Sequence, residues 1–504
     1  MENAKTSGLQ KLKNFFKPID LTKGKEWKVL LTYALPIIIS YLLQQFYLLS
    51  DSVICGQTLS VDEITGVNNT YSLSFLVMQF AFGCTAGFCV VTAKDVGDRN
   101  YAGVRKSFAT QIILCSIITV ILTTVACLTV TPLLSLVNVT PKNPGVYTAA
   151  RDYLFVMFLG IFAQMFYNFI ISILRSVGDS FTPLVFLAIS TTMNIVLDLL
   201  FIKVFHWGVR GAAVATILTQ ALCTVACFIY TFIRYKELRL SGNDFKLSFK
   251  DVKEHLCQGL PLGLQFSVLA IGIIVMAGQT VKFDLDANGV MDAMKPVQNG
   301  TNAANKLIEF LLAPLSAFGT AMVSFSAQNV GAMDFDRIKK GAVQGLIIAS
   351  VMGLALGLIG ILLTINGAYQ KIFLSSEKIT EKSLRYGTTF LMIDMGMFIT
   401  LGWLFALRSS LQGIGKSTLT LVSGGAELVA RVLICMFLPS IVLGGAITSD
   451  AGLGAYIALS FGDAGAWVLA DLVLIYPYVK YILKENYSYL DGHKSLKGTK
   501  NERV

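Results

Sequence analysis

The sequence predicts an all-α integral membrane protein built from two similar halves. Hydrophobic residues make up 54% of the 504 residues and charged residues only 14%, whereas a typical soluble chain carries about 25% charged residues. The mean hydropathy is +0.65. The apolar residues lie in continuous runs of about 20 residues or more, the length a helix needs to cross a bilayer. Such runs disfavour a β-barrel, whose strands alternate apolar and polar residues.

Three short patches occur once in each half of the chain and indicate an internal duplication. They are an Ala-x-x-Val-Gly stretch at 93–97 and 327–331, a Leu-x-x-x-Gly-x-Ser stretch at 174–180 and 411–417, and a Pro within an apolar run at Pro36 and Pro261. A duplicated apolar unit is typical of transporters, in which two lobes move about a site between them.

Twelve apolar runs predict twelve membrane-spanning helices, six in each half. The predicted spans are 29–50, 71–93, 108–137, 152–174, 181–204 and 209–233 in the first half, and 256–280, 307–330, 341–366, 386–411, 418–444 and 453–483 in the second. Several contain Gly or Pro, which membrane helices tolerate when neighbouring helices satisfy the freed backbone groups.

The distribution of basic residues predicts that both chain ends lie in the cytoplasm. With the N-terminus inside, 29 of the 41 Lys and Arg residues fall in cytoplasmic segments and 11 in outer loops, which agrees with the positive-inside rule. Six spans in each half make the two repeats parallel. The predicted parts are a cytoplasmic tail (1–28), a first lobe (29–233), a cytoplasmic linker (234–255), a second lobe (256–484) and a second cytoplasmic tail (485–504).

The outer segment 281–306 departs from the symmetry of the two halves. It contains several Asp and Asn residues and is slightly longer than the matching segment 51–70. It lacks the ligand spacing and terminal Glu of an EF-hand calcium loop. We interpret it as a solvated loop, and a cap over the outer mouth of the protein is the alternative.

Several function classes are disfavoured by what the sequence lacks. The net charge of +10 does not indicate nucleic-acid binding, because the basic residues are scattered between apolar runs. The three His residues lie at or near span ends or in the tails, and there is no metalloprotease, nucleophile-elbow or phosphate-loop motif. We therefore predict that the protein is not an enzyme and uses no cofactor.

Acidic side chains within the spans are few, and a charge at mid-bilayer costs about 2.5–3.5 kcal/mol. Asp51 closes the first span, and Asp198 lies in the outer half of the fifth, four residues after Asn194 and on the same helix face. Thr216 lies at a similar depth in the sixth span. We therefore expect one polar cluster in the first lobe, made of two carboxylates and neutral oxygen donors.

Two carboxylates close together in a medium of low dielectric constant cannot both ionise comfortably. Either the pair takes up a proton, or a bound Na⁺ neutralises it with further oxygens from Asn194 and Thr216. In the structural alternative, Asp51 only ends a helix and Asp198 only makes a hydrogen bond. We predict that Asp51, Asn194, Asp198 and Thr216 bind a cation, and the choice between H⁺ and Na⁺ stays open.

The second lobe also carries charged residues within its spans. Glu427 and Arg431 form an i, i+4 pair in the favourable orientation, which we interpret as structural. Asp394 and Asp471 have no partner evident in the sequence, and contact with a substrate is an open alternative for each of them.

Together these residues resemble the multidrug and toxic compound extrusion (MATE) transporters over about 28–485. The likeness is carried by the stretches 35–51, 93–97, 174–183, 194–198 and 208–216. The resemblance implies a V-shaped pair of six-helix bundles that exports organic, often cationic, compounds in exchange for H⁺ or Na⁺. In the family branch that has a first-lobe site, the cation-binding positions match the four residues predicted above.

Another branch of this family uses acidic residues in the seventh and tenth spans. In this chain the stretch 261–269 of the seventh span has no carboxylate, and the tenth-span position falls near Leu401, two turns from Asp394. We do not expect a second-lobe cation site of that type.

The resemblance also implies alternating access, with a coupling ion that is H⁺ or Na⁺. The substrate, a small cationic or amphipathic organic compound, is expected between the lobes or within the first lobe. The residues predicted to line its cavity are Gln44, Tyr47, Met78, Phe166 and Tyr167. We expect a monomer in the plasma or inner membrane, in contact with lipid and with no nucleic-acid partner.

The alternative function is the flipping of a lipid-linked precursor by a protein of a related fold. That function predicts a strongly basic central cavity. The mid-span cation is Arg431, which Glu427 offsets, so the sequence favours export of small organic compounds.

Overall fold

The computed structural model describes residues 17–137, 139–374 and 376–484. Within these ranges the chain forms helices and no extended strand. Ten helices are long and apolar enough to cross a membrane, and two bent helix pairs bring the number to twelve. The predicted all-α membrane fold is confirmed. Of the predicted tails, 1–28 and 485–504, the residues 1–16 and 485–504 lie outside the described residues.

The helices follow the predicted order of spans. In the first half they are α2 (Glu26–Thr58), α3 (Val61–Gly97), α4 (Tyr101–Leu128), α5 (Val130–Leu136), α6 (Pro144–Leu159), α7 (Ile161–Ser176), α8 (Phe181–Asp198) and α9 (Gly208–Arg234). In the second half they are α10 (Phe249–Lys282), α11 (Pro296–Gly331), α12 (Phe335–Leu362), α13 (Ala368–Phe373), α14 (Glu381–Gly396), α15 (Phe398–Gly413), α16 (Ser417–Leu443) and α17 (Leu453–Tyr478). Short 3₁₀ turns at Lys236–Leu238 and Gly242–Phe245 precede α10.

Many helices extend beyond the predicted spans. The segment 51–70, expected as an outer loop, is mostly divided between the end of α2 and the start of α3. Ser60 caps α3, because its hydroxyl accepts a hydrogen bond from the Glu63 N–H while the Glu63 carboxylate accepts one from the Ser60 N–H. This reciprocal capping starts a helix in a polar stretch, which a count of apolar residues overlooks.

The outer segment 281–306 is also shorter as a loop than expected, because α11 begins at Pro296. The buried carboxylate of Asp284 accepts hydrogen bonds from the N–H groups of Val297 and Gln298, at 3.0 and 2.9 Å. Negative charge at a helix N-terminus is favourable. Asp284 therefore holds the first turn of α11 in place.

Two predicted spans consist of bent helix pairs at matching places in the two halves. The span 152–174 lies within α6 and α7, which meet at 45°, and the span 386–411 lies within α14 and α15, which meet at 48°. The matched bends agree with the internal duplication read from the sequence.

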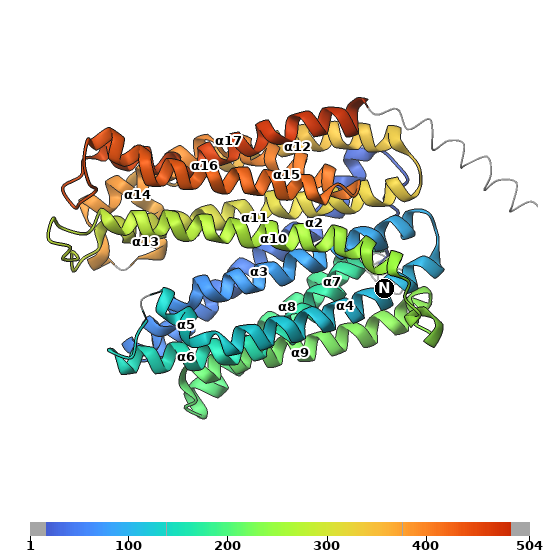
Figure 1. The fold of residues 1–504 in the computed structure, drawn as a ribbon, viewed down its shortest axis with the longest axis horizontal. Coiled ribbons are helices and arrows are strands. Elements are labelled where there is room, and N and C mark those ends of the chain that lie inside the picture. Colours follow the sequence, from blue (N-terminus) through green and yellow to red (C-terminus); the bar gives the residue numbers. More distant parts are fainter. Residues whose placement is uncertain (1–16, 138, 375, 485–504) are drawn as a thin grey trace, which may run out of the picture.

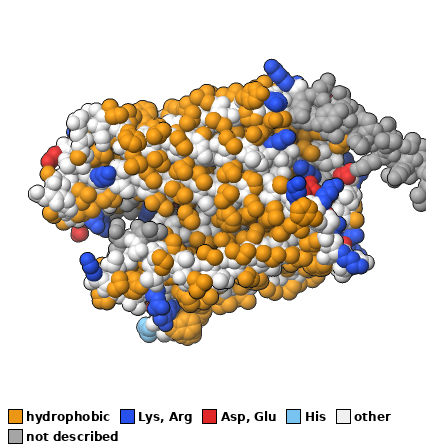
Figure 2. All heavy atoms as spheres, in the orientation of Figure 1, with side chains coloured by type: hydrophobic (Ala, Val, Ile, Leu, Met, Phe, Trp, Pro, Cys, Tyr) orange, Lys and Arg blue, Asp and Glu red, His pale blue; other side chains and the backbone are white. Residues whose placement is uncertain are grey.

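The helices form two bundles arranged as a V (Figure 1). Helices α4 and α6–α9 lie in one bundle and α12 and α14–α17 in the other, with α2, α3, α10 and α11 between them. The bundles meet at one end, which we call the closed end and which the charge distribution predicts to be cytoplasmic. At the opposite end the surface is hollowed between them (Figure 2).

Glycines allow the bundles to meet at the closed end. Gly97, the last residue of α3, packs against the backbone of Gln328 in α11, and Gly331, the last residue of α11, packs against the backbone of Lys94 in α3. A Cβ atom at either position would overlap a backbone atom. The two glycines are equivalent positions of the repeated Ala-x-x-Val-Gly patch, so this patch forms the crossing of two helices.

The segment that precedes α2 also joins the two bundles. The Ile19 N–H donates to the Gly178 carbonyl at 3.0 Å on one side. On the other side, the Leu21 carbonyl accepts hydrogen bonds from Asn329 Nδ2 at 3.1 Å and from Arg337 Nε at 3.2 Å. This segment therefore stabilises the closed end as observed.

The outer surface of the bundles is apolar between the two ends. Figure 2 shows hydrophobic side chains across the middle of the molecule, with Lys and Arg gathered near the ends. Large side chains such as Ile121, Ile229 and Leu354 are more than half exposed. Such a surface is favourable against lipid and unfavourable against water.

We predict that the Gly97→Ala variant is less stable than the wild-type protein by about 1–3 kcal/mol, the usual cost of overpacking. The added methyl group forces the ends of α3 and α11 apart. Thermal unfolding of the purified protein in detergent measures the change.

The matched control is Gly56→Ala in α2, where a Cβ atom has no heavy atom within 4 Å. This variant should unfold at the wild-type temperature or slightly above it, because Ala favours a helix more than Gly does. Equal stability of the two variants would contradict the packing role of Gly97.

Candidate functional site

The structure brings the carboxyl groups of Asp51 and Asp198 together. Asp51 lies two turns before the end of α2, and Asp198 is the last residue of α8. The two carboxyl groups interact directly. Asp198 is 0% exposed, and neither of its oxygens accepts a hydrogen bond from an N–H, hydroxyl or thiol group of the described residues. Asp198 is thus buried and Asp51 half-buried, and neither forms an ion pair with a described basic residue.

The backbone around Asp198 departs from regular α-helix. The chain continues from α8 into a π-helical turn at Leu199–Val204. Turns of this kind are rare and occur frequently at functional sites. This turn directly follows the buried carboxyl group of Asp198.

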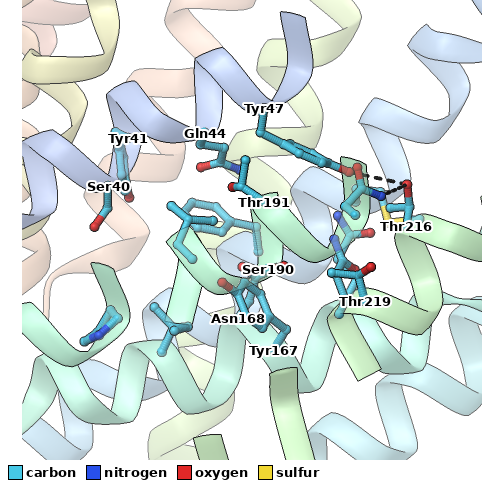
Figure 3. A pocket seen from close by; sticks show the side chains of 18 of the residues that line it. Ser40, Tyr41, Gln44, Tyr47, Tyr167, Asn168, Ser190, Thr191, Thr216 and Thr219 are labelled. Carbon is cyan, nitrogen blue, oxygen red and sulfur yellow. Dashed lines mark hydrogen bonds between the residues drawn. The ribbon is translucent and has the colours of Figure 1, made fainter. Parts of the chain in front are cut away.

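Asn194 and Thr216 lie next to this pair. Asn194 Nδ2 donates to Thr216 Oγ1 at 3.5 Å, and the Tyr47 hydroxyl lies 3.3 Å from the same oxygen (Figure 3). Asn194 precedes Asp198 by one helical turn on α8. The predicted residues therefore occupy two adjoining groups, the carboxyl pair and the Asn194–Thr216–Tyr47 cluster.

The free acceptor atoms of these groups indicate what they can hold. Both oxygens of Asp198 and Oδ1 of Asn194 are buried without a hydrogen-bond donor. A buried acceptor left unsatisfied costs about 1–3 kcal/mol. A proton shared by the carboxyl groups, or a cation that prefers oxygen ligands, removes this cost. Binding of such an ion by Asp51, Asn194, Asp198 and Thr216 stays a prediction.

A cavity of about 150 Å³ lies inside the first bundle beside Asn194 and Thr216. Its walls come from α2, α3, α7, α8 and α9. Figure 3 shows Ser40, Tyr41, Gln44 and Tyr47 of α2 facing Tyr167 and Asn168 of α7, with side chains of α8 and α9 between them. Of the residues predicted to line a substrate cavity, four do so: Gln44, Tyr47, Met78 and Tyr167.

Phe166 does not line this cavity, contrary to the prediction. It is 8% exposed and packs in the apolar core, with its ring 4.4 Å from that of Phe162 and 6.0 Å from that of Phe169. Neighbouring residues of a helix point about 100° apart. Tyr167 faces the cavity, so Phe166 turns into the core.

Most of the polar wall of the cavity was not predicted from the sequence. The residues of α7 that line it are Gln164, Tyr167, Asn168, Ile171, Ser172 and Arg175. Their spacing of three or four residues is that of one helix face. This polar stripe inside an apolar run is the sequence signal that could have identified the cavity.

The charged residues of the second bundle form an ion-pair network. Glu427 contacts Arg431 at 3.3 Å, as its i, i+4 spacing predicts, and also Arg408 at 2.9 Å. Arg431 contacts Asp463 at 2.6 Å. Arg408 and Asp463 were not identified from the sequence, because partners on different helices are not adjacent in the chain. The network supports a structural interpretation of Glu427 and Arg431.

Asp394 and Asp471 are buried in the same bundle. Neither oxygen of either carboxyl group has a hydrogen-bond partner among the described residues. Asp394 lies next to the bend between α14 and α15. Neither residue lines the cavity of the first bundle.

Comparisons with known proteins agree with this fold. The family described as MatE matches residues 36–200 and 299–437, more than half of the chain. The chain is 27% identical over 315 residues to the probable multidrug resistance protein YpnP of Bacillus subtilis, covering 62% of this chain and 67% of that protein. It is 24% identical over 398 residues to the probable multidrug resistance protein YoeA of the same organism, covering 78% and 82%.

Solved structures show the same architecture. The chain is similar to a structure described as the outward-facing conformation of a multidrug resistance MATE family transporter. The TM-score is 0.77 at 20% sequence identity, and the match covers 92% of this chain and 98% of that one. At this identity the similarity establishes the fold.

We predict that Asp198→Asn raises the stability of the purified protein at pH 8 by about 1–3 kcal/mol. The amide has nearly the same volume, removes one ionisable group from the buried pair and can donate a hydrogen bond to Asp51. Thermal unfolding in detergent measures the change.

The comparison variant is Asp463→Asn, which makes the same chemical change in an ion pair. It should lower stability, on the order of 3 kcal/mol, because Arg431 loses one of its two carboxylate partners in the interior. A loss of stability in both variants would show that the Asp198 carboxylate has a compensating partner.

Proposed function

The chain belongs to the MatE family of transporters, and from this premise we propose that it exports small organic compounds in exchange for H⁺ or Na⁺. The family match and the fold support transport. The names of the relatives YpnP and YoeA, both probable multidrug resistance proteins, support small organic substrates. We further propose that the coupling ion binds in the first bundle.

The observation that carries this proposal is the Asp51–Asp198 pair, in which Asp198 is fully buried. Ionised carboxyl groups in a bilayer interior are expensive and usually mark ion pathways or proton relays. Asp394 and Asp471 of the second bundle also lack an ionic partner among the described residues. In the first bundle, however, two carboxyl groups interact with each other, and no described basic residue pairs with either. A proton or Na⁺ is the compensating charge that the site requires.

The proposed ion site adjoins the cavity along α8. Asn194 is one turn from Asp198 on α8 and donates to Thr216, whose hydroxyl also lies within hydrogen-bond distance of Tyr47. All three of these residues line the cavity. Arrival of a cation at the carboxyl pair therefore changes the electrostatics and the hydrogen bonds of the substrate-binding wall.

Exchange also requires that the ion prefer one of two conformations, since a ligand shifts an equilibrium only by its differential affinity. In the observed conformation the bundles meet at the closed end and diverge at the other. We propose that a cation entering from outside neutralises the carboxyl pair and favours substrate release in this conformation. Return to the opposite conformation then exposes the site to the cytoplasm.

The alternative of a lipid-linked precursor flippase finds no support in the second bundle. That function predicts a strongly basic central cavity. Arg337, Arg408 and Arg431, the described buried arginines of this bundle, are each paired with a carboxylate.

We predict that Asp198→Asn abolishes gradient-driven export, reducing it at least tenfold, because the remaining Asp51 cannot form the paired site. The measurement is transport of a panel of fluorescent organic dyes in proteoliposomes under separate pH and Na⁺ gradients. The wild-type protein should respond to one of the two gradients.

Asp152→Asn serves as the matched control, since Asp152 pairs at 2.9 Å with Arg210, whose side chain is largely exposed. This variant should transport at the wild-type rate. Coupled transport by Asp198→Asn, or wild-type transport that ignores both gradients, would refute the proposed ion site.

A further inference from the structure

Arg175 brings a positive charge to the wall of the first-bundle cavity. It lies in the last turn of α7, is 9% exposed and lines the cavity. Its Nε atom is buried without a hydrogen-bond acceptor. No ion pair between described residues includes it. A buried guanidinium without an acidic partner is uncommon and calls for a ligand.

The acidic residue nearest in the sequence is engaged elsewhere. Asp179 follows Arg175 by four residues, but its carboxylate accepts hydrogen bonds from the N–H and hydroxyl of Thr182 and from the Tyr235 hydroxyl at 2.6–2.9 Å. These three donors satisfy the Asp179 carboxylate, and no ion pair joins it to Arg175. The guanidinium is therefore free to bind a group inside the cavity.

Two weaker interactions stabilise the charge of Arg175 without filling its donors. The guanidinium carbon lies 5.4 Å from the centre of the Tyr41 ring, a cation–π contact. The residue also lies at the C-terminal end of α7, where the helix dipole favours a positive charge. A guanidinium has five N–H donors, and neither interaction provides an acceptor oxygen for them.

The rest of the cavity wall is uncharged and combines polar with apolar side chains. Arg175 is the one charged side chain among the described residues that line it. Carboxamides come from several helices, among them Gln44, Gln79, Gln164, Asn168 and Gln220. Such groups donate and accept hydrogen bonds with many partners but attract no cation by charge. The electrostatics of this wall therefore favour a negative group over the cationic one expected from the sequence.

We propose that this cavity binds small organic compounds through an anionic group, a carboxylate or a phosphate, held by Arg175. The planar guanidinium forms two parallel hydrogen bonds with either group, and the carboxamides bind the remaining polar atoms. The proposal deepens the proposed function, because the bound compound is taken to be the exported one. A cavity of about 150 Å³ holds a ligand of the size of one substituted benzene ring.

The second half of the chain supplies the informative substitution. Gln412 stands at the position equivalent to Arg175 in the repeated Leu-x-x-x-Gly-x-Ser patch and is also buried. The Arg175→Gln variant thus places in the first bundle the residue that the second bundle accommodates at this turn. Arg175→Lys keeps the charge but loses the planar pair of donors.

The test is calorimetric binding of salicylate, salicylamide and phenyl phosphate to the purified full-length protein at pH 7. Salicylate and the neutral salicylamide are nearly equal in shape, and phenyl phosphate tests the other anion. We expect at least one anion to bind at least tenfold more tightly than salicylamide. Arg175→Gln should remove this preference, Arg175→Lys should reduce it, and Arg234→Gln, at an exposed arginine of the same bundle, should leave it unchanged.

The pattern of binding identifies the preferred group. Tighter binding of salicylate indicates a carboxylate ligand, and tighter binding of phenyl phosphate indicates a phosphate ligand. The proposal is overturned if neither anion binds, or if neither binds more tightly than salicylamide. It is also overturned if both anions bind equally to the wild type and to Arg175→Gln. If Arg175→Gln does not fold, the comparison of the wild type with Arg175→Lys decides.

Equilibrium binding needs no ion gradient, so its outcome is separate from that of ion coupling. Failure of anion binding with gradient-driven transport intact refutes the role of Arg175 alone. Intact anion binding with transport that ignores both gradients refutes the coupling proposal alone.

Discussion

The packing of α2 against both bundles is the constraint on which the rest of the structure depends. In its first half, Leu30, Ala34 and Ile37 are fully buried in one apolar cluster with Phe318 and Phe325 of α11. Its second half carries Tyr47 and Asp51 to α8 and α9 of the first bundle. One helix therefore links the contact between the bundles to the buried carboxyl pair. A change in the charge of Asp51 therefore acts on α2, a helix that packs against both bundles.

The sequence predicts those parts of the arrangement that follow from the free-energy cost of a charge in the bilayer and from the periodicity of a helix. Asp51 and Asp198 could be identified because a carboxylate is expensive in an apolar run, and Asn194 because it lies one turn from Asp198. The sequence does not determine how each helix is rotated about its axis. Phe166 was therefore predicted to line the cavity, whereas its neighbour Tyr167 lines it and Phe166 does not. Hydropathy also does not predict the helical ends within 51–70, because a helix begins there in a polar stretch that Ser60 caps.

The two halves have kept their packing and diverged in their charges. Gly97 and Gly331 make the same close crossing at the closed end, where any side chain would overlap a backbone atom. The buried charges are different. The second bundle neutralises Arg431 with Glu427 and Asp463, whereas the first leaves its carboxyl pair and Arg175 without described ionic partners. The second bundle also keeps the unpaired carboxyl groups of Asp394 and Asp471. Among the described buried arginines, however, Arg175 alone has no ion pair, and it lines the cavity.

Within the first bundle the two kinds of unneutralised charge occupy different places. Arg175 adjoins the closed end, since the next residue, Ser176, accepts a hydrogen bond from Gln328 of α11. The carboxyl pair lies beyond the Asn194–Thr216 cluster. An anionic group bound at Arg175 and a cation bound at Asp198 would each neutralise a different buried charge, so neither needs to displace the other by direct contact. If the anionic compound and the cation compete, they must then do so by favouring different conformations. The end of α7 that carries Arg175 adjoins the closed end, whereas the proposed ion site lies on α2 and α8.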